Sequence, residues 1–201
     1  MSESIETKIV RKIKRAKKDV LFSADMLAKF GNAKAVSKAL ERLVQQEKLY
    51  RVATGFYALP KMHDLGMILP GIDEVALAIA KRDKARVVPT GSYALYKLGL
   101  TTQVPMNVVY YTDTSARFVK IGKRTIKFKK ASSRNLAFKG EISIIVVQAL
   151  RTLGKGNATN EEIAHIKMIL QNENPTYLKH DLLLAPVWIR ELLTNENEKI
   201  K

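Results

Sequence analysis

Several cationic and polar side chains gather where an expected helix begins and in the hairpin that follows it. Val36, Leu40 and Leu43 recur at the spacing of one helical face. They predict a helix over residues 33–47, with the polar residues off this apolar stripe. Lysine and arginine bind phosphates, whereas asparagine and serine can also hydrogen-bond to base edges. The candidate DNA-binding residues are Asn32, Lys34, Ser37, Lys38, Arg42, Arg51 and Thr54.

A second run of cations lies in the middle of the chain. Nine basic residues and no acidic residue stand between Asp113 and Glu141. The members that form the expected second basic patch are Arg117, Lys120, Lys123, Arg124, Lys127, Lys129 and Lys130. Such a run could contact DNA or an anionic surface of a partner protein. It could equally be a solvated sheet face whose lysines protect an edge strand from aggregation, and the sequence leaves these alternatives open.

The overall charge favours an anionic partner. The 201 residues include 35 Lys and Arg against 19 Asp and Glu, which gives a formal net charge of +16. Residues 1–60 alone carry 13 basic and 6 acidic residues, a net charge of +7. A chain this basic repels itself unless a partner neutralises it, and nucleic acid is a more usual partner than an anionic membrane surface. The alternative is that the charge serves only solubility.

The residue types that could support catalysis are scattered. The absence of cysteine excludes disulfides, thiolate nucleophiles and zinc-finger ligand sets. A nuclease needs carboxylates grouped around metal ions, yet the candidates follow no motif spacing. These carboxylates are Asp73, Glu74, Asp113 and Glu141, and the histidines are His63, His165 and His180. We therefore expect a protein that is not an enzyme and that uses no cofactor or metal, with Asp113 as a turn residue.

The N-terminal cations lie on helices and a hairpin whose order along the chain can be predicted from the sequence. Apolar spacing predicts helices over 3–16 and 33–47, with a further helix between them that begins after Ser23, a favourable N-cap. Two β-prone runs, 49–52 and 56–59, flank a turn that contains Gly55 and predict a hairpin. Three helices followed by a hairpin predict a winged helix-turn-helix over residues 1–60.

The remainder predicts a second domain of mixed α/β structure. Proline and glycine mark a linker over residues 61–70, followed by a domain over 71–195 and a frayed tail over 196–201. Strand-like runs over 108–112, 117–121 and 124–129 predict a small, mainly antiparallel sheet, and helices are expected from 142 onward. The fold class is thus α+β. No signal peptide and no apolar run of about 20 residues is visible, so we expect a soluble, cytoplasmic protein without membrane association.

The sequence resembles the AbiEi-type antitoxins of type IV toxin–antitoxin (abortive infection) systems. The N-terminal match lies in Ala39–Leu43, Leu49–Arg51 and Gly55–Tyr57. The more specific match is PTGSYALYKLGLTTQVP, from Pro89 to Pro105, and it continues in Tyr111–Asp113, Arg117, Ile121–Gly122 and Gln148–Arg151. Together these segments cover most of residues 5–193. One departure is Thr114, where the family often has glycine, and it affects only the local turn.

The resemblance implies an antitoxin that represses its own two-gene operon and counteracts a nucleotidyltransferase-type toxin. The expected partners are therefore double-stranded DNA with promoter inverted repeats, the cognate toxin, and a second copy of the chain on DNA. Two alternatives from other classes remain at this point. One is a DNA nuclease targeted by a winged helix, and the other is a non-enzymatic module that binds the toxin without sequence-specific DNA binding.

Overall fold

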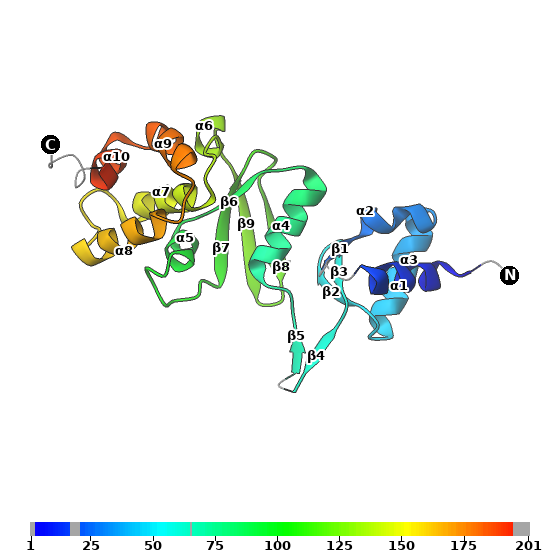
Figure 1. Ribbon diagram of the computed structural model, residues 1–201. Helices are drawn as coiled ribbons and strands as arrows, with labels where there is room; N and C mark the ends of the chain where they lie inside the picture. Colours follow the sequence, from blue (N-terminus) through cyan, green and yellow to red (C-terminus); the bar gives the residue numbers. More distant parts are fainter. Residues whose placement is uncertain (1–2, 17–20, 65, 195–201) are drawn as a thin grey trace. The chain divides into compact units, whose positions relative to one another are not determined.

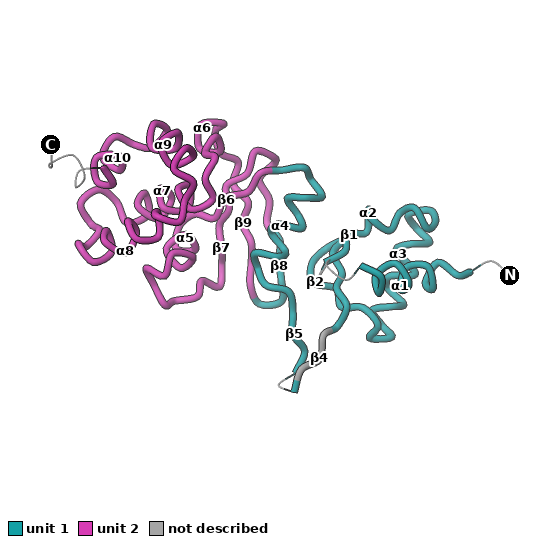
Figure 2. The backbone as a smooth tube through the Cα atoms, in the orientation of Figure 1, with its two compact units in different colours: residues 1–85, 119–123 teal, residues 86–118, 124–201 magenta. Residues whose placement is uncertain are grey.

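The computed structural model describes residues 3–16, 21–64 and 66–194. The fold divides into two compact units, one formed by residues 1–85 with 119–123 and the other by residues 86–118 with 124–201 (Figure 2). The first unit therefore extends past the expected linker at 61–70 and includes helix α4 (Ile72–Asp83), which contacts strand β1 (Phe22–Ser23). The tail expected over 196–201 lies outside the described residues.

The first unit begins with four helical segments and a three-stranded sheet (Figure 1). Strand β3 (Phe56–Ala58) lies in the middle of the sheet and pairs antiparallel with both neighbours. In chain order the elements before β3 are α1 (Ile5–Arg15), β1, α2 (Ala24–Leu27), the 3-10 helix η1 (Ala28–Phe30), α3 (Ala33–Gln45) and β2 (Tyr50–Ala53). The sequence predicts each of these helices to within two or three residues, and the hairpin β2–β3.

Side-chain caps fix where these helices begin. The Ser23 hydroxyl accepts a hydrogen bond from the Met26 N–H at 3.4 Å, which confirms the expected cap of α2. Ser4 caps α1 in the same way. These caps satisfy backbone donors that have no partner within the helix. The apolar stripes then close over one core, in which Ile9, Leu27, Leu40 and Leu43 are buried together. The sequence thus predicts both the residues that cap the helices and the residues that form the core.

The segment expected as a linker contains regular structure. Strands β4 (Lys61–His63) and β5 (Gly66–Ile68) pair antiparallel as a short hairpin. Helix α4 follows, and its first turn carries Asp73 and Glu74, as the sequence suggests. The Glu74 carboxylate accepts from the Gly71 N–H at 2.7 Å. Proline and glycine mark a turn-rich stretch correctly here, but they do not exclude a two-stranded hairpin.

The second unit is built on β6, β7 and β9 of a sheet with the strand order β6-β7-β9-β8, in which residues 119–121 of β8 are assigned to the first unit (Figure 1). Strands β6 (Val87–Thr90) and β7 (Asn107–Thr112) pair antiparallel, whereas β7 and β9 (Arg124–Lys130) run parallel. The edge strand β8 (Arg117–Ile121) lies next to β9. The short helix α5 (Ser92–Lys97) lies between β6 and β7, and the short helix α6 (Ser133–Leu136) follows β9. The expected small sheet is confirmed, and its parallel pair is a feature that the sequence did not indicate.

Four helices complete the second unit. They are α7 (Glu141–Leu153), α8 (Asn160–Leu170), α9 (Pro175–Leu184) and α10 (Val187–Thr194). Helix α7 contacts β6 and α5, and α8 and α9 pack against α7 in turn. The buried core of the unit joins Phe138, Ile166 and Ile189 with five α7 side chains, Ile144, Val146, Val147, Ala149 and Leu150. The expected α+β class with C-terminal helices is confirmed, and no described helix has the length and apolar character to cross a membrane.

Two carboxylates from the C-terminal segment bind the backbone where α7 begins. Asp181, 1% exposed, accepts hydrogen bonds from the N–H groups of Lys139 at 2.8 Å and Gly140 at 2.7 Å, and from the Ser143 hydroxyl. Glu173 accepts from the Ile142 and Ser143 N–H groups at 2.8 and 3.0 Å. Burial acts to raise the pKa of Asp181, but these hydrogen bonds, with one from His180, outweigh it and lower that pKa.

Candidate nucleic-acid interface

The N-terminal end of α3 presents a polar, cationic face. Lys34, Ser37 and Lys38 are all exposed. Their spacing of three and four residues places them on one side of the helix, opposite the buried stripe that contains Leu40. The helix dipole leaves partial positive charge at this end, which adds to the attraction of an anion. The structure thus brings together three of the residues expected to bind DNA.

Asn32 has a structural role in addition to the one expected. It is the N-cap of α3, and its Oδ1 accepts a hydrogen bond from the Ala35 N–H at 2.8 Å. This carboxamide oxygen is therefore already used as a hydrogen-bond acceptor within the protein. The sequence does indicate this role, because asparagine directly before an apolar helical pattern is a typical cap. We therefore assign Asn32 first to positioning α3.

Arg42, at the other end of α3, is paired within the unit. Its Nη1 lies 2.8 Å from Oε1 of Glu6 in α1, and the Arg42 side chain is 61% exposed. The sequence analysis assigned Arg42 to DNA because Arg42 lies off the apolar stripe. It did not predict the ion pair with Glu6, which lies 36 residues earlier. The pair joins α1 to α3, although an exposed ion pair contributes only about 0–1 kcal/mol to stability.

We expect Arg42→Ala to have a small effect on both stability and DNA affinity. The free energy of unfolding should fall by about 1 kcal/mol or less, because the broken ion pair is solvent-exposed. The loss of DNA affinity should be smaller than that of Lys38→Ala, because Glu6 already neutralises Arg42. Fluorescence anisotropy with a labelled duplex, together with urea unfolding, measures both quantities. A loss of affinity larger than that of Lys38→Ala would restore Arg42 as a principal DNA contact.

The hairpin places the remaining candidates next to a tight turn. Arg51 and Thr54 are exposed, and Thr54–Gly55 connects β2 to β3. Gly55 has φ +76°, a left-handed conformation that a side chain would strain. The pairing of β2 with β3 shifts register between Arg51 and Ala53, as in a β-bulge. The hairpin therefore leaves the Arg51 and Thr54 side chains exposed to solvent, as the sequence predicts.

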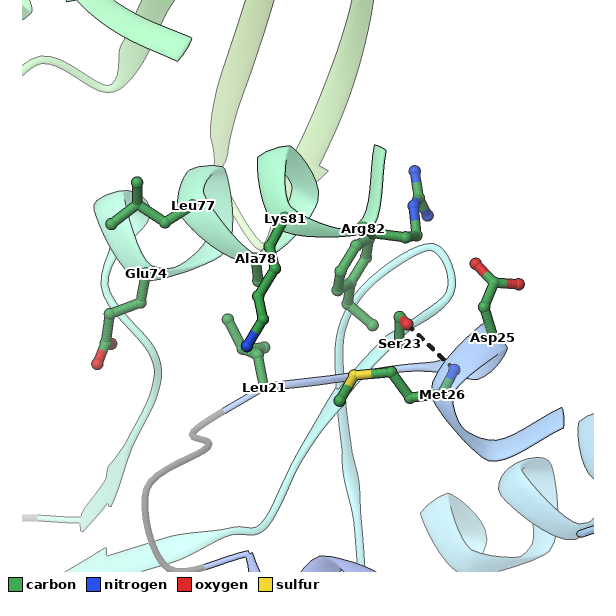
Figure 3. A pocket seen from close by; sticks show the side chains of 10 residues that line it. Leu21, Ser23, Asp25, Met26, Glu74, Leu77, Ala78, Lys81 and Arg82 are labelled. Atoms are coloured by element: carbon green, nitrogen blue, oxygen red, sulfur yellow. Dashed lines mark hydrogen bonds between the residues drawn. The ribbon is translucent and has the colours of Figure 1, made fainter. Parts of the chain in front are cut away.

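A pocket of about 600 Å³ lies elsewhere in the first unit, between α4 and the segment that leads into α2 (Figure 3). Leu77 and Ala78 of α4 line one side, and Leu21 and Met26 line the other. The Ser23 hydroxyl in its wall is already bonded to the Met26 N–H. The Arg82 guanidinium, also in the wall, lies 4.7 Å from the centre of the Phe56 ring. The pocket is mostly apolar, and the DNA-binding candidates are not among the residues that line it.

Two members of the second basic patch make contacts within the protein. Arg117 lies 5.3 Å from the centre of the Phe128 ring, and Arg124 donates to the Pro105 carbonyl at 3.2 Å, so both side chains are engaged within the protein. Along β9 the side chains alternate, with Ile126 and Phe128 buried. The exposed members are Lys120, Lys123, Lys129 and Lys130. Of these, Lys120 and Lys123 belong to the first unit and the others to the second.

The residues considered for catalysis have structural partners. Asp113 Oδ1 accepts from the Arg86 N–H at 2.9 Å, so it joins the start of β6 to the end of β7 instead of bonding its own turn. His165 Nε2 lies 2.8 Å from the Leu98 carbonyl oxygen, and His180 Nδ1 lies 2.8 Å from Asp181. The His63 side chain lies outside what the structure describes. Within the described residues, no three His, Asp or Glu side chains form a group that could hold a metal ion.

Comparison with known proteins connects the chain to one family. No curated protein matches the sequence. One family model matches residues 8–178, a span that contains α3, the hairpin, the sheet and helices α7 and α8. That model is described as a family of unknown function, DUF6088. Since the match covers most of both units, the chain belongs to the DUF6088 family.

Proposed function

We propose that the first unit is a winged helix-turn-helix that binds double-stranded DNA, and that the protein represses transcription of its own operon. The observation that carries this proposal is the exposed group Lys34, Ser37 and Lys38 at the N-terminal end of α3. In helix-turn-helix proteins this end of the second helix of the motif enters the major groove and contacts bases. Here lysines would bind phosphates and Ser37 would face a base edge.

The order of elements supports the same proposal. A helix, a short strand, two further helices and a hairpin follow one another, and β1 joins the hairpin in one sheet. Winged helices have this order, with the hairpin as the wing beside the groove-binding helix. Arg51 and Thr54 would then contact a neighbouring phosphate or the minor groove. The net charge of +16 supports a polyanionic partner independently of the topology.

The decisive experiment is a mobility-shift assay on the DNA upstream of the protein's own gene, with a scrambled duplex of equal length. Both duplexes are titrated at about 50 and 200 mM salt, because non-specific binding falls steeply over this range. Specific retardation that persists at the higher salt is the expected result. Equal, salt-sensitive binding to both duplexes would contradict a sequence-reading repressor. Two retarded species on an inverted repeat would support two copies on DNA.

We further propose that the second unit supplies antitoxin activity against a nucleotidyltransferase-type toxin encoded in the same operon. This part derives from the resemblance of Pro89–Pro105 and the segments that follow it to AbiEi-type antitoxins. The test is rescue of growth when the neighbouring gene is induced, with and without the antitoxin. Co-purification of the two proteins distinguishes neutralisation by direct contact from neutralisation through the toxin's target.

Reversing exposed charges tests whether the basic segment takes part. We expect Lys120→Glu/Lys123→Glu to impair either growth rescue or cooperative DNA binding, because both side chains are exposed and the change replaces two positive charges by two negative ones. Lys155→Glu/Lys179→Glu is the control, since it makes the same charge change at exposed sites outside the segment. If both pairs behave like the wild type in both assays, the segment is a solvated surface.

A further inference from the structure

The second unit contains a polar pocket that the proposed DNA-binding function does not use. Its volume is about 250 Å³. It lies where the end of β6, the middle of β7, the end of β9 and one face of α7 meet. The lining residues are Thr90, Gly91, Val109, Tyr111, Lys129, Gln148, Arg151 and Thr152. Two segments that are distant in the sequence, Thr90–Gly91 and Gln148–Arg151, thus face the same space.

The sheet register explains how these side chains meet. Tyr111 of β7 pairs with Lys129 of the parallel strand β9 and with Val88 of β6. Because side chains alternate along a strand, Val109 and Tyr111 share one face with Lys129 beside them. Helix α7 contributes Gln148 and Arg151, whose spacing of three residues places them on one helical face. Two cations from different elements therefore converge on one pocket.

Gln148 is the least expected residue in this wall. It is 1% exposed, and its Nε2 has no hydrogen-bond partner among the described residues. The Thr90 hydroxyl donates to its Oε1 at 3.4 Å, which leaves the amide nitrogen as the unpartnered group. A buried donor without an acceptor is costly and often indicates a water or ion that completes the site. Gln148 is itself one of the residues that line the pocket.

The electrostatics favour an anion with more than one negative charge. Arg151 is partly buried and donates to Asn135 Oδ1 at 2.8 Å, which holds the guanidinium in place and leaves it other donors. Burial lowers the pKa of Arg151, but an arginine remains charged at neutral pH. Lys129 adds a second cation. Among the described residues that line the pocket none is acidic, so these charges are not neutralised from within its wall.

We propose that this pocket binds a phosphate group, either as inorganic phosphate or as the phosphate of a small monoester, through Arg151, Lys129 and Gln148. A phosphate monoester carries a charge of about −1.5 to −2 at neutral pH, which matches two cations better than a carboxylate does. Its several acceptor oxygens suit donors that arrive from different elements. The volume is slightly below the range of about 300–1,000 Å³ typical of drug-sized ligands, so the ligand is small.

Calorimetric titration of the full-length protein in a phosphate-free buffer tests this proposal. Inorganic phosphate, adenosine monophosphate and acetate are titrated separately, so that the first two distinguish a free ion from a monoester. Saturable binding of at least one phosphate ligand, with acetate at least tenfold weaker, is expected. In an NMR spectrum of the ¹⁵N-labelled protein, the Gln148 side-chain amide should shift during the same titration. Absence of saturable phosphate binding, or acetate binding of equal strength, would overturn the proposal.

Variants locate the binding in this pocket. Gln148→Leu and Arg151→Gln should each raise the dissociation constant for phosphate at least tenfold, and Arg151→Lys should lose less because it keeps the charge. Lys129→Gln should also weaken binding. Its matched control is Lys130→Gln, since the neighbouring strand residue points to the other face and does not line the pocket. The dispersion of the NMR spectrum establishes that each variant is folded. Undiminished binding by folded Gln148→Leu and Arg151→Gln would overturn the assignment.

This inference is independent of the proposed DNA-binding function. The pocket belongs to the second unit, whereas the α3 face belongs to the first. Lys34→Ala/Lys38→Ala should leave phosphate binding unchanged, because both side chains lie in the other unit. A loss of phosphate binding in that variant would place the site on the first unit and contradict the proposal. Failure of operator binding with intact phosphate binding would reject only the proposed repressor function.

Discussion

Asp181→Ala lowers the free energy of unfolding of the second unit by about 3–5 kcal/mol, the usual cost of removing one partner from a buried charged network. The substitution leaves the N–H groups of Lys139 and Gly140 and the Ser143 hydroxyl without the acceptor that each has in the wild type. A buried donor that loses its acceptor costs about 1–3 kcal/mol. Since these donors stand where α7 begins, the loss should affect the central helix of the unit.

The single tryptophan gives a local readout of this loss. Trp188 lies in α10 and packs against the core that contains α7, so its fluorescence during urea unfolding reports the second unit. Ser143→Ala, which removes one of the three donors, is the comparison and should cost about 1 kcal/mol. If Asp181→Ala cost no more than Ser143→Ala, the carboxylate would not be the group that holds this helix start.

The contribution of Asp181 should also depend on pH in a defined direction. Its pKa is lower in the folded protein than the value of about 3.9 for an unfolded chain. Its stabilisation is therefore present in full above that value, and it is lost as the pH falls through the folded pKa. The difference in unfolding free energy between the wild type and Asp181→Asn should shrink from pH 6 to pH 3. If this difference in unfolding free energy instead grew as the pH fell, the pKa of Asp181 would be raised in the folded protein, contrary to our expectation.

Lys34→Ala/Lys38→Ala should weaken DNA binding about 50-fold at about 0.1 M salt if each lysine neutralises one phosphate. The slope of log K against log salt concentration should become shallower by about 1.8, since about 0.9 counterion is released per phosphate contact. The loss should be similar on operator and scrambled duplexes, because phosphate contacts carry no sequence information. Fluorescence anisotropy over a range of salt concentrations measures both the affinity and the slope.

A control variant that loses the same number of positive charges distinguishes local phosphate contacts from the overall electrostatic attraction of a basic protein. Lys155→Ala/Lys179→Ala removes the same two charges from exposed sites in the second unit. We expect its slope to remain near that of the wild type. Equal slopes for all three proteins would exclude the N-terminal end of α3 as the phosphate-binding face. Circular dichroism should be unchanged in both variants, because neither lysine pair is buried.

The sequence by itself determined the local structure of this protein. Apolar residues at helical spacing, such as Val36, Leu40 and Leu43, located the helices, because only such a spacing forms a continuous apolar face. The strand-like run over 124–129 located β9, and Ser23 marked a helix start that the structure confirms. These features depend on residues within one or two turns of each other, so no knowledge of the tertiary fold was needed.

Local sequence patterns did not predict ion pairs and hydrogen bonds between residues that are distant in the sequence. The Glu6–Arg42 pair and the hydrogen bonds of Asp181 join residues more than 30 positions apart, and no local pattern indicates them. For this reason Arg42 was assigned to DNA, and Asp181 was not singled out at all. Asn32 is the exception, since its capping role was readable from its place directly before a helix.

Only the tertiary structure decided which cations share a surface. In the sequence, Arg117 to Lys130 is one basic run. In the fold, Arg117 lies against the Phe128 ring and Arg124 donates to the Pro105 carbonyl, whereas Lys120, Lys123, Lys129 and Lys130 are exposed. The parallel pairing of β7 with β9 places Lys129 beside Tyr111, and the packing of α7 on the sheet brings Arg151 and Gln148 to the same pocket. Strand pairing and helix packing are long-range choices set by the burial of whole faces, so a local reading of the chain could not predict this pocket.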